Sequence, residues 1–366
     1  MKNTFGQNVA LTVFGESHGE CVGVVVDGLA PGIKVDENFI AKQLARRAPS
    51  TNVDTARREK DAFKIVSGVF NGSTTGTPLC VIIPNEGMIS SDYSYGTARP
   101  SHADYTAYEK YHGFEDYRGG GHFSGRITAA IVAAGGIVMP ALNKKGIYIG
   151  SHIKRCAGVN DRDFNDYLED IDTLSSSSFA VLDSDAKEEM ISRAEAAARE
   201  GDSVGGILET AIIGLPAGLG EPWFDSIESR LSHAMFGIPA VKGIEFGAGF
   251  DMVDARGSEY NDPFRMNGDR VVTTTNNNGG INGGITNGMP VLMRLAVKPT
   301  PSIYKKQESV NMFKGVNEDL VIEGRHDPAI IHRARIVADS LVAVVIYDIM
   351  AGRYGTDYFA GSKEDK

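Results

Sequence analysis

The sequence is poor in cysteine, with only Cys21, Cys80 and Cys156 among 366 residues. They are widely spaced and odd in number, and no Cys-x-x-Cys pair occurs, so the sequence predicts neither a disulfide framework nor a metal site such as zinc. Three reduced thiols are typical of a cytoplasmic protein, and that is the location we expect.

Positive charge is also scarce, because 37 lysines and arginines face 47 aspartates and glutamates, which gives a net charge of −10. This balance argues against nucleic acid or an anionic membrane surface as a partner. The N-terminus lacks the apolar segment of a secretory signal, and we expect no apolar run of the roughly 20 residues that span a membrane. Any anion site must therefore be built from locally placed arginines.

Strand-like and helix-like segments alternate along the chain, which predicts one large α+β domain over residues 1–366. The polar tail 361–366 is expected to be disordered. Apolar, β-branched runs predict strands at 9–14, 22–26, 63–70, 79–83 and 291–297. Apolar spacing and composition predict helices at 36–48, 103–111, 127–142 and 186–200.

Two segments of the chain resemble each other. Residues 23–32 and 206–218 both read as an apolar strand and a Gly-Leu turn, and an amphipathic helix follows each, with Asp36 and Asp225 as the expected caps. A distant internal duplication explains this echo, and so does the general likeness of strand–turn–helix units. A duplication would give halves of about 1–145 and 200–350, with ligand sites between them.

The most informative run is Arg118-Gly119-Gly120-Gly121-His122-Phe123-Ser124-Gly125-Arg126. Glycines let backbone N–H groups approach a ligand, and arginines offer a fork of donors suited to phosphate or carboxylate. The spacing is neither that of a P-loop nor that of a dinucleotide fingerprint. The run therefore predicts an anion site at the start of a helix; the alternative is a tight glycine turn before a core helix.

Two histidine clusters add titratable groups. In Gly15-Glu16-Ser17-His18-Gly19, neighbouring side chains point apart, so His18 is a candidate proton donor rather than the base of a Ser17 nucleophile. In Arg99-Pro100-Ser101-His102-Ala103-Asp104, Ser101 is the expected helix cap, which places a neutral His102 at the helix N-terminus. Alternatively, the first is a hydrogen-bonded loop histidine and the second an ordinary helix start.

Further candidates lie in the second half of the chain. Arg325-His326-Asp327-Pro328 combines an anion donor, a titratable ring and a carboxylate, with Arg333 close behind. The stiff turn Lys298-Pro299-Thr300-Pro301-Ser302 is suited to a phosphate or the edge of a flavin ring. The Asn/Gly-dense segment 276–288 predicts a loop shaped for close approach to a ligand.

Together and in this order, these motifs resemble the chorismate synthase family nearly from end to end. The motifs that carry the resemblance are Gly15-Glu16-Ser17-His18-Gly19, Ser67-Gly68-Val69-Phe70 with Thr74-Thr75-Gly76-Thr77, Arg99-Pro100-Ser101-His102-Ala103-Asp104-Tyr105, Tyr117-Arg118-Gly119-Gly120-Gly121, Gly201-Asp202-Ser203, Pro216-Ala217-Gly218-Leu219-Gly220-Glu221-Pro222, Ala240-Val241-Lys242-Gly243, Lys298-Pro299-Thr300 and Gly324-Arg325-His326-Asp327-Pro328.

The resemblance implies a lyase of the shikimate pathway, which leads to the aromatic amino acids. The reaction is an anti 1,4-elimination of phosphate from 5-enolpyruvylshikimate 3-phosphate to give chorismate, and it requires reduced FMN. The implied fold is a β-α-β sandwich with an internal pseudo-twofold duplication, assembled as a homotetramer. NADPH or a separate flavin reductase would supply the reducing equivalents.

The resemblance also implies roles for single residues. His18 would protonate the leaving phosphate, His102 would lie near flavin N1, and Asp327 with Ser17 and Ser124 would relay the abstracted proton near N5. Cations around the substrate would be Arg47, Arg118, Arg126 and Arg333, with Arg47 also implied for NADP. Contacts to FMN would come from His122, Phe123, Ser124, Pro239, Ala240, Gly283, Lys298, Pro299, Thr300, Pro301, Ser302 and Arg325.

Three positions depart from the family pattern. His122 stands where many members have arginine, and Pro239 stands where asparagine is common. Arg46-Arg47-Ala48-Pro49-Ser50 is less basic than the usual Arg-Arg-Arg-Pro-Gly run. Two other classes of protein compete with the resemblance: a lyase or transferase acting on phosphate esters without flavin, and a non-enzymatic RNA- or anion-binding protein.

Overall fold

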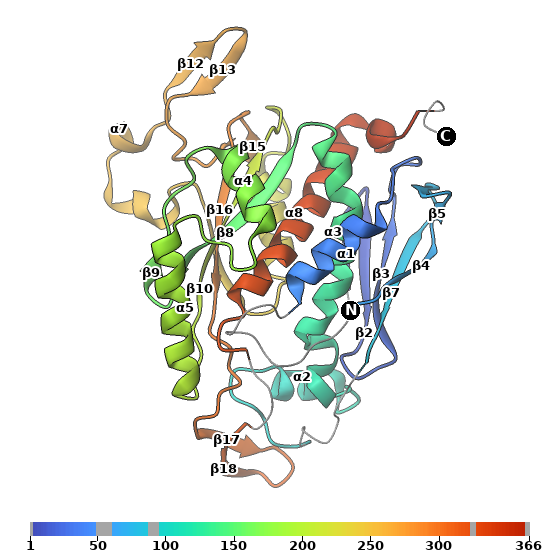
Figure 1. Cartoon of the computed structure of the whole chain (residues 1–366), viewed down its shortest axis with the longest axis vertical. Coiled ribbons are helices and arrows are strands. Elements are labelled where there is room, and N and C mark those ends of the chain that lie inside the picture. Colours follow the sequence, from blue (N-terminus) through green and yellow to red (C-terminus); the bar gives the residue numbers. More distant parts are fainter. Residues whose placement is uncertain (1–2, 49–60, 87–94, 323–326, 363–366) are drawn as a thin grey trace.

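Two antiparallel sheets enclose a layer of helices (Figure 1). The structure is a computed structural model that describes residues 3–48, 61–86, 95–322 and 327–362. The first sheet has five strands in the order β1 (Thr4–Phe5), β2 (Ala10–Gly15), β3 (Cys21–Asp27), β7 (Leu79–Pro84) and β4 (Lys64–Ser67). The second has five in the order β11 (Val241–Phe246), β16 (Val291–Val297), β10 (Gly206–Ile213), β8 (Tyr148–Cys156) and β9 (Val159–Asn160).

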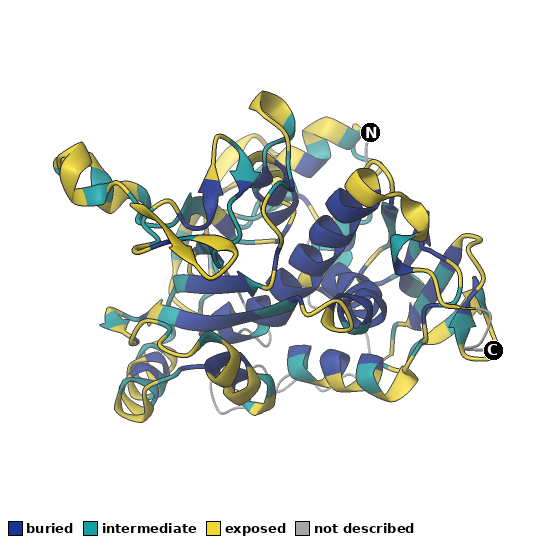
Figure 2. Cartoon of the chain, turned by 90° about the horizontal axis from the view of Figure 1, so that it is seen from above, coloured by how far each residue is buried: buried dark blue, intermediate teal, exposed yellow. Residues whose placement is uncertain are grey.

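The layer between the sheets consists mainly of α1 (Glu37–Arg47), α3 (Thr128–Asn143), α6 (Ile227–Met235) and α8 (Ile331–Tyr354). Figure 2 shows the long central helices as almost wholly buried. Helices α3 and α8 cross closely because residue 135 is glycine: a Cβ there would lie 2.4 Å from Cβ of Ser340. Helix α3 is apolar all round, as is typical of a helix enclosed on every side, whereas α8 also buries Arg335, Asp339 and Asp348.

One buried segment has the length and composition of a membrane span, contrary to the expectation from the sequence. Gly125–Asn143 has a mean hydropathy of 1.6 over its 18-residue window, but 89% of that window is buried inside the protein. The segment packs against α1, α8 and the first sheet. It is therefore accounted for as the core helix of a folded domain.

The remaining elements lie around this sandwich (Figure 1). Helices α4 (Tyr167–Ser176) and α5 (Ser184–Arg199) lie beside the second sheet, and α7 (Gly257–Tyr260) leads into the projecting hairpin of β12 (Phe264–Asn267) and β13 (Arg270–Thr273). At the opposite end, α2 (Asp104–Tyr111) lies near the hairpin of β17 (Gln307–Asn311) and β18 (Val316–Leu320). Two further hairpins are β5 (Val69–Phe70) with β6 (Ser73–Thr74) and β14 (Ile281–Asn282) with β15 (Ile285–Thr286).

The echo between the two strand–turn–helix segments is also present in the hydrogen bonds. Each turn is tied to a hairpin threonine whose hydroxyl accepts one backbone N–H and donates to one carbonyl oxygen. The partners are Ile33 (2.9 Å) and Ala30 (2.6 Å) for Thr74, and Leu219 (2.9 Å) and Pro216 (2.7 Å) for Thr286. The strand orders β4-β7-β3-β2-β1 and β11-β16-β10-β8-β9 also correspond. In this correspondence β8 occupies the position in the second sheet that β2 occupies in the first. The second sheet therefore includes residues before 200, where the second half was expected to begin.

The structure corrects two expected helix caps. Asp36 caps α1 as predicted, because its side chain accepts hydrogen bonds from the N–H groups of Asn38 and Phe39. Helix α6, however, is capped by Ser226 rather than Asp225, since Ser226 alone is placed to accept from the third residue of the helix. Ser101 does not cap α2, because it adopts the left-handed region with φ of 59° and the N-cap position falls on Ala103.

Candidate active site

The glycine run Gly119–Gly121 packs against the turn that follows β2 and carries Ser17 and His18. A Cβ on Gly119 would lie 2.5 Å from Cδ2 of His18 and 2.8 Å from Oγ of Ser17, so only glycine fits. All three glycines have φ between 52° and 79°, which other residues adopt at a cost. The helical segment Gly125–Asn143 begins at the end of the run, as the sequence predicts, with Ser124 as its cap, and the three glycines before it pack against Ser17 and His18.

Ser17 and His18 are almost enclosed, with 1% and 5% of their surfaces exposed. The N–H of Ser17 donates to the Gly121 carbonyl at 3.0 Å. The run Gly15–Gly19 has the Gly-x-Ser-x-Gly spacing of a nucleophile elbow, but it joins the antiparallel strands β2 and β3 instead of a strand and a helix. This context agrees with a proton-transfer role for His18 better than with a Ser17 nucleophile.

Arg118 is held beside this turn by Asp116. The Arg118 side chain makes two hydrogen bonds of 2.8 Å to the Asp116 carboxylate. These bonds, the backbone N–H of Arg118 and the nearby charges of Arg118 and His18 lower the pKa of Asp116 against the opposing effect of partial burial. Arg118 keeps 41% of its side chain exposed, so its outer edge is accessible to an anion.

His122 fixes the end of β2. Its Nδ1 lies 2.7 Å from the carbonyl oxygen of Gly15 and, because a carbonyl only accepts, Nδ1 carries the proton. The neighbouring Phe123 is 43% exposed and meets Tyr111 edge-on at 6.0 Å. The Ser124 hydroxyl accepts a hydrogen bond of 3.3 Å from the Arg126 N–H. His122 therefore makes a hydrogen bond within the protein, to the backbone of Gly15. Its contact to a cofactor stays a prediction.

Arg47 and Arg126 meet at one carboxylate, that of Asp61. Arg47 donates from Nε at 3.2 Å and from its terminal nitrogen at 2.6 Å, and Arg126 donates to the other oxygen. All three side chains are at most 6% exposed. Arg126 also donates from Nε to the Asn85 amide oxygen at 2.9 Å and from a terminal nitrogen to the Pro84 carbonyl at 3.0 Å. Arg126 is thus engaged within the protein, and its predicted contact to a substrate stays a prediction.

Arg333 lies next to this group. Its Nε donates to the backbone carbonyl of Arg47 at 2.8 Å, and a terminal nitrogen pairs with Asp327 at 2.7 Å. Arg333 therefore links Asp327, the predicted proton-relay carboxylate, to Arg47, one of the predicted substrate cations. Arg325, another predicted contact, lies outside the described residues.

His102 is joined to the turn Lys298–Ser302, which lies about 200 residues away in the sequence. Its Nδ1 lies 3.0 Å from the Pro100 carbonyl and Nε2 lies 2.9 Å from Oγ of Ser302, so the neutral ring donates through Nδ1 and accepts through Nε2. Burial, and to a smaller extent the charge of Arg99, lower the pKa of His102 from 6.5 to about 4. The neutral state expected from the sequence agrees with this environment, although its main cause is burial.

We expect neutral His102 to make stability pH-dependent. Because its folded pKa is lower than 6.5, its contribution is present above pH 6.5 and is lost as the pH falls toward about 4. Between pH 7 and pH 5, wild type should lose about 2 kcal/mol more unfolding free energy than His102→Gln in urea titrations. Parallel losses in the two proteins would contradict this assignment.

The turn Lys298–Ser302 has features suited to a ligand. Lys298 donates to the Ser101 carbonyl at 2.7 Å, and its backbone N–H bonds to the carbonyl of Ala240, a residue held at φ of 73°. In the described part of the chain, Oγ1 of Thr300 is buried without a hydrogen-bond partner. A buried hydroxyl without a partner is costly, and a bound group with polar edges would satisfy it. The Thr300 hydroxyl is the group of this turn that fits the polar edge of a flavin ring.

Two predicted cofactor contacts are less connected to this turn. Gly283 has φ of 62° in the turn between β14 and β15, which packs against α6 through Gly284. Pro239 lies directly before Ala240, in the segment that leads into β11. The contacts of both residues with a cofactor stay predictions.

Three residues of the site were missed from the sequence: Asp61, Asn85 and Asp116. The Asn85 amide donates to the carbonyls of Glu16 and Gly19, both at 2.9 Å, and so secures the turn that carries His18. A polar residue at the end of a predicted strand, as Asn85 is, and carboxylates near arginines were the available signals. Neither signal predicts which residue each side chain contacts, because the fold determines the contact.

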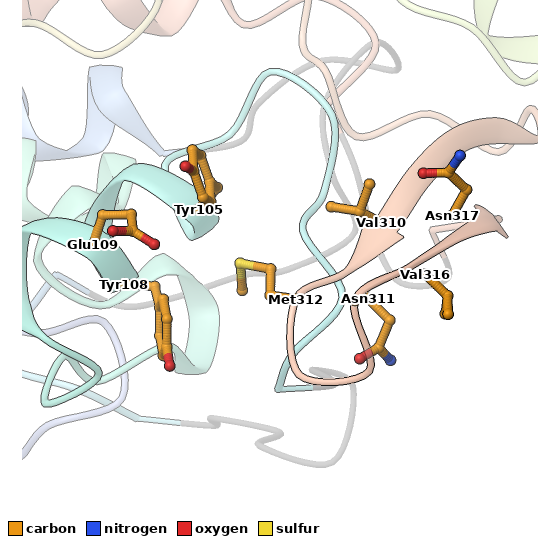
Figure 3. Close-up of a pocket in the computed structure, with 9 residues that line it drawn as sticks. Tyr105, Tyr108, Glu109, Val310, Asn311, Met312, Val316 and Asn317 are labelled. Carbon is orange, nitrogen blue, oxygen red and sulfur yellow. The ribbon is translucent and has the colours of Figure 1, made fainter.

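A separate pocket of about 260 Å³ lies between α2 and the β17–β18 hairpin (Figure 3). Tyr105, Tyr108 and Met312 line it together with the polar side chains of Glu109, Asn311 and Asn317 (Figure 3). None of the predicted site residues is among its lining residues.

Comparisons with known proteins agree with one another. A family model described as chorismate synthase matches residues 9–351. A chorismate synthase from Pyrococcus abyssi is 48% identical over 94% of this chain and 96% of its own, and one from Dehalococcoides mccartyi is 44% identical over 95% and 96%. A crystal structure of chorismate synthase superimposes with a TM-score of 0.76 at 27% identity, covering 96% of this chain and 94% of the other.

Proposed function

The chain belongs to the chorismate synthase family, and from this premise we propose that it eliminates phosphate from 5-enolpyruvylshikimate 3-phosphate to give chorismate. The observation that carries the proposal is the convergence of Ser17, His18 and Arg118 on one glycine-lined turn. The substrate bears a phosphate and two carboxylates, so it needs several cations, and the departing phosphate needs an acid. The site offers both.

His18 is the proposed acid for the departing phosphate. Its turn is fixed on one side by the glycine run and on the other by Asn85, so its orientation is set before substrate binds. Arg118, with its exposed edge, is the proposed first contact for a substrate anion, and Arg47, Arg126 and Arg333 add positive charge behind it. Asp327, oriented by Arg333, is the proposed acceptor of the abstracted proton, with Ser17 and Ser124 as relay groups.

The family requires a reduced flavin, and we propose that it is FMN. When bound, the reduced flavin supplies electron density that assists cleavage of the C–O bond. The residues that would hold it are His102, the turn Lys298–Ser302, Pro239 and Ala240, and the segment His122–Ser124, with Gly283 and Arg325 as further contacts. Neutral His102 would lie beside the flavin without adding a charge.

Other properties implied by the family are also proposals for this chain. The reductant is either NADPH, for which Arg47 is the implied contact, or a separate flavin reductase. A homotetramer is supported by large exposed aromatic side chains, such as Trp223 at 85% and Phe224 at 88% exposure. Surfaces of this kind are typical of protein interfaces. We further propose a cytoplasmic location.

The decisive experiment is an anaerobic assay with 5-enolpyruvylshikimate 3-phosphate and chemically reduced FMN. We expect chorismate and phosphate to form in equal amounts, and no turnover without the flavin. Release of phosphate in the absence of flavin would favour a flavin-independent lyase. Repeating the assay with oxidised FMN and NADPH tells whether the protein reduces its own flavin.

A binding protein without enzymatic activity is separated by the same assay. It would form no chorismate under either condition, and alanine at His18 and His102 would leave its ligand affinity unchanged. The net charge of −10 already argues against RNA as the ligand.

A further inference from the structure

Asp61 occupies the centre of the buried charges behind the site. It carries one carboxylate between two arginines, Arg47 and Arg126, and the side chains of this trio are at most 6% exposed. Two enclosed guanidinium groups facing each other repel, and an unpaired buried charge costs several kcal/mol. Asp61 therefore provides the charge that lets both arginines remain buried and charged.

The environment keeps Asp61 in the ionised form. Burial acts to raise the pKa of its carboxyl, but the charges and hydrogen bonds of Arg47 and Arg126 outweigh burial and lower the pKa below its usual value. One oxygen serves each arginine. The carboxylate thereby sets the distance and orientation between the two guanidinium planes.

On one side, this contact continues to the catalytic turn. Arg126 donates to the Asn85 amide oxygen at 2.9 Å, and the Asn85 amide nitrogen donates to the carbonyls of Glu16 and Gly19. These two carbonyls flank Ser17 and His18. The position of Asp61 is thus transmitted through two side chains to the backbone that carries the proposed acid.

On the other side, the contact continues to the proposed proton acceptor. The carbonyl of Arg47 accepts a hydrogen bond from Arg333, which pairs with Asp327 at 2.7 Å. A single series of hydrogen bonds therefore runs from Asp327 to the turn of His18, and Asp61 is at its middle. The elimination needs its acid and its base at fixed positions on opposite sides of the substrate.

We infer that Asp61 is a positioning residue for the elimination, which fixes Arg47 and Arg126 and, through Arg126 and Asn85, the turn that presents Ser17 and His18. The inference rests on the proposed function, since it concerns the geometry of that reaction. Asp61 acts through its neighbours and makes no contact with substrate. It is an internal counter-ion that fixes the positions of Arg47 and Arg126. Its negative charge also reduces the attraction of these arginines for the anionic substrate.

The test is Asp61→Asn, which keeps the shape of the side chain and removes its charge. We expect kcat to fall about 10- to 100-fold, because small displacements of catalytic groups have effects of this size. The Kd for 5-enolpyruvylshikimate 3-phosphate, measured by calorimetry without flavin, should stay the same or decrease, since the site gains net positive charge. General damage to the site would weaken binding instead.

The matched control is Asp170→Asn, which removes a carboxylate from a two-point arginine contact on α4, a helix that carries none of the site residues. Asp170 is 8% exposed and pairs with Arg162 at 2.5 and 3.0 Å. This variant should lose thermal stability but keep the wild-type kcat. A kcat for Asp61→Asn within twofold of wild type, or a Kd increase that accompanies the fall in kcat, would overturn the inference.

A second variant covers the case in which Asp61→Asn does not fold. Asn85→Asp keeps the oxygen that accepts from Arg126 but loses the amide donor to Glu16 and Gly19. We expect kcat to fall about tenfold, with Kd for the anionic substrate equal or higher because the site gains a negative charge; a wild-type kcat would overturn the coupling to the His18 turn. Absence of chorismate formation by the wild-type protein would instead contradict the proposed function.

Discussion

Replacing His18 by asparagine should lower kcat about 10²- to 10⁴-fold while leaving the substrate affinity within a fewfold of wild type. General acid catalysis contributes rate accelerations of this size, and a departing phosphate is a strong candidate for protonation. Asparagine occupies the space of the imidazole without offering a titratable proton. The measurement is kcat with reduced FMN under anaerobic conditions, together with the Kd of the substrate by calorimetry.

The position of His18 explains why a large kinetic effect should come with a small effect on stability. Its turn is held by backbone contacts, the N–H of Ser17 to Gly121 and the carbonyls that Asn85 engages. His112→Asn is a suitable control, because His112 has the left-handed conformation with φ of 57°, which asparagine tolerates well. If His18→Asn raised KM and left kcat unchanged, His18 would be a binding residue and the acid would lie elsewhere.

Replacing His152 by leucine should destabilise the protein by about 3–5 kcal/mol without a comparable effect on the kcat of the folded fraction. His152 lies in β8, wholly buried, with Nδ1 2.6 Å from Asp161 and Nε2 3.0 Å from Glu209. Both nitrogens face carboxylate oxygens, so both carry protons and the ring is a cation. Leucine would leave two buried carboxylates without their shared counter-ion.

The other groups around His152 support this assignment. Asp161 also accepts from the backbone N–H groups of Arg162, Leu182 and Asp183, which hold it as a carboxylate. The ring of Phe164 packs edge-on against the His152 ring, with 4.7 Å between the ring centroids. Glu209 lies opposite Arg294 in the register of β10 and β16. Burial, and after it the negative charge of Glu209, raise the pKa of the Tyr167 phenol.

The pH dependence follows from the direction of the shift. Burial acts to lower the pKa of His152, but the hydrogen bonds and charges of Asp161 and Glu209 outweigh it, and the pKa is raised above 6.5. Its contribution to stability is therefore complete below pH 6.5 and is lost as the pH rises through the raised value. Melting temperatures from pH 6 to pH 9 should fall more steeply for wild type than for His152→Leu.

His152→Gln is the milder variant for the case in which leucine prevents folding, since its amide can still donate to one carboxylate. A loss of unfolding free energy below about 1 kcal/mol in urea titrations of either variant would show that the cation is not needed. So would identical pH slopes in variant and wild type.

The sequence predicts the elements of the sandwich well where periodicity and composition agree. The strand expected at 79–83 is β7, and the helix at 36–48 is α1 with Asp36 as its cap. Single backbone conformations were less predictable: Ser101 has a positive φ, which no local pattern signals, and the cap of α6 shifts by one residue to Ser226. Local rules fail at these positions because tertiary contacts fix them.

The site was predictable as a set of residue types but not as a set of contacts. His18, His102 and the glycine run could be identified, whereas the pairing of Asp61 with Arg126 spans 65 residues and that of His102 with Ser302 spans 200. Glycine composition alone also could not show that the run packs against the His18 turn, where a Cβ on Gly119 would lie 2.5 Å from the His18 ring; the anion site predicted for the run stays a prediction.

The matched turns at Thr74 and Thr286 have a consequence for how the two halves of the chain depend on each other. Two copies of one unit, fused in a single chain, form a dimer that cannot dissociate, because the tether keeps each half at an effective concentration of about millimolar. The copies are then free to differ. After β2 the first half carries Ser17 and His18, whereas after β8 the second turns directly into β9 through Ala157 and Gly158. The turn with Ser17 and His18 is therefore present in one half only, while the second half adds Asp327, Arg333 and the turn Lys298–Ser302 to the site.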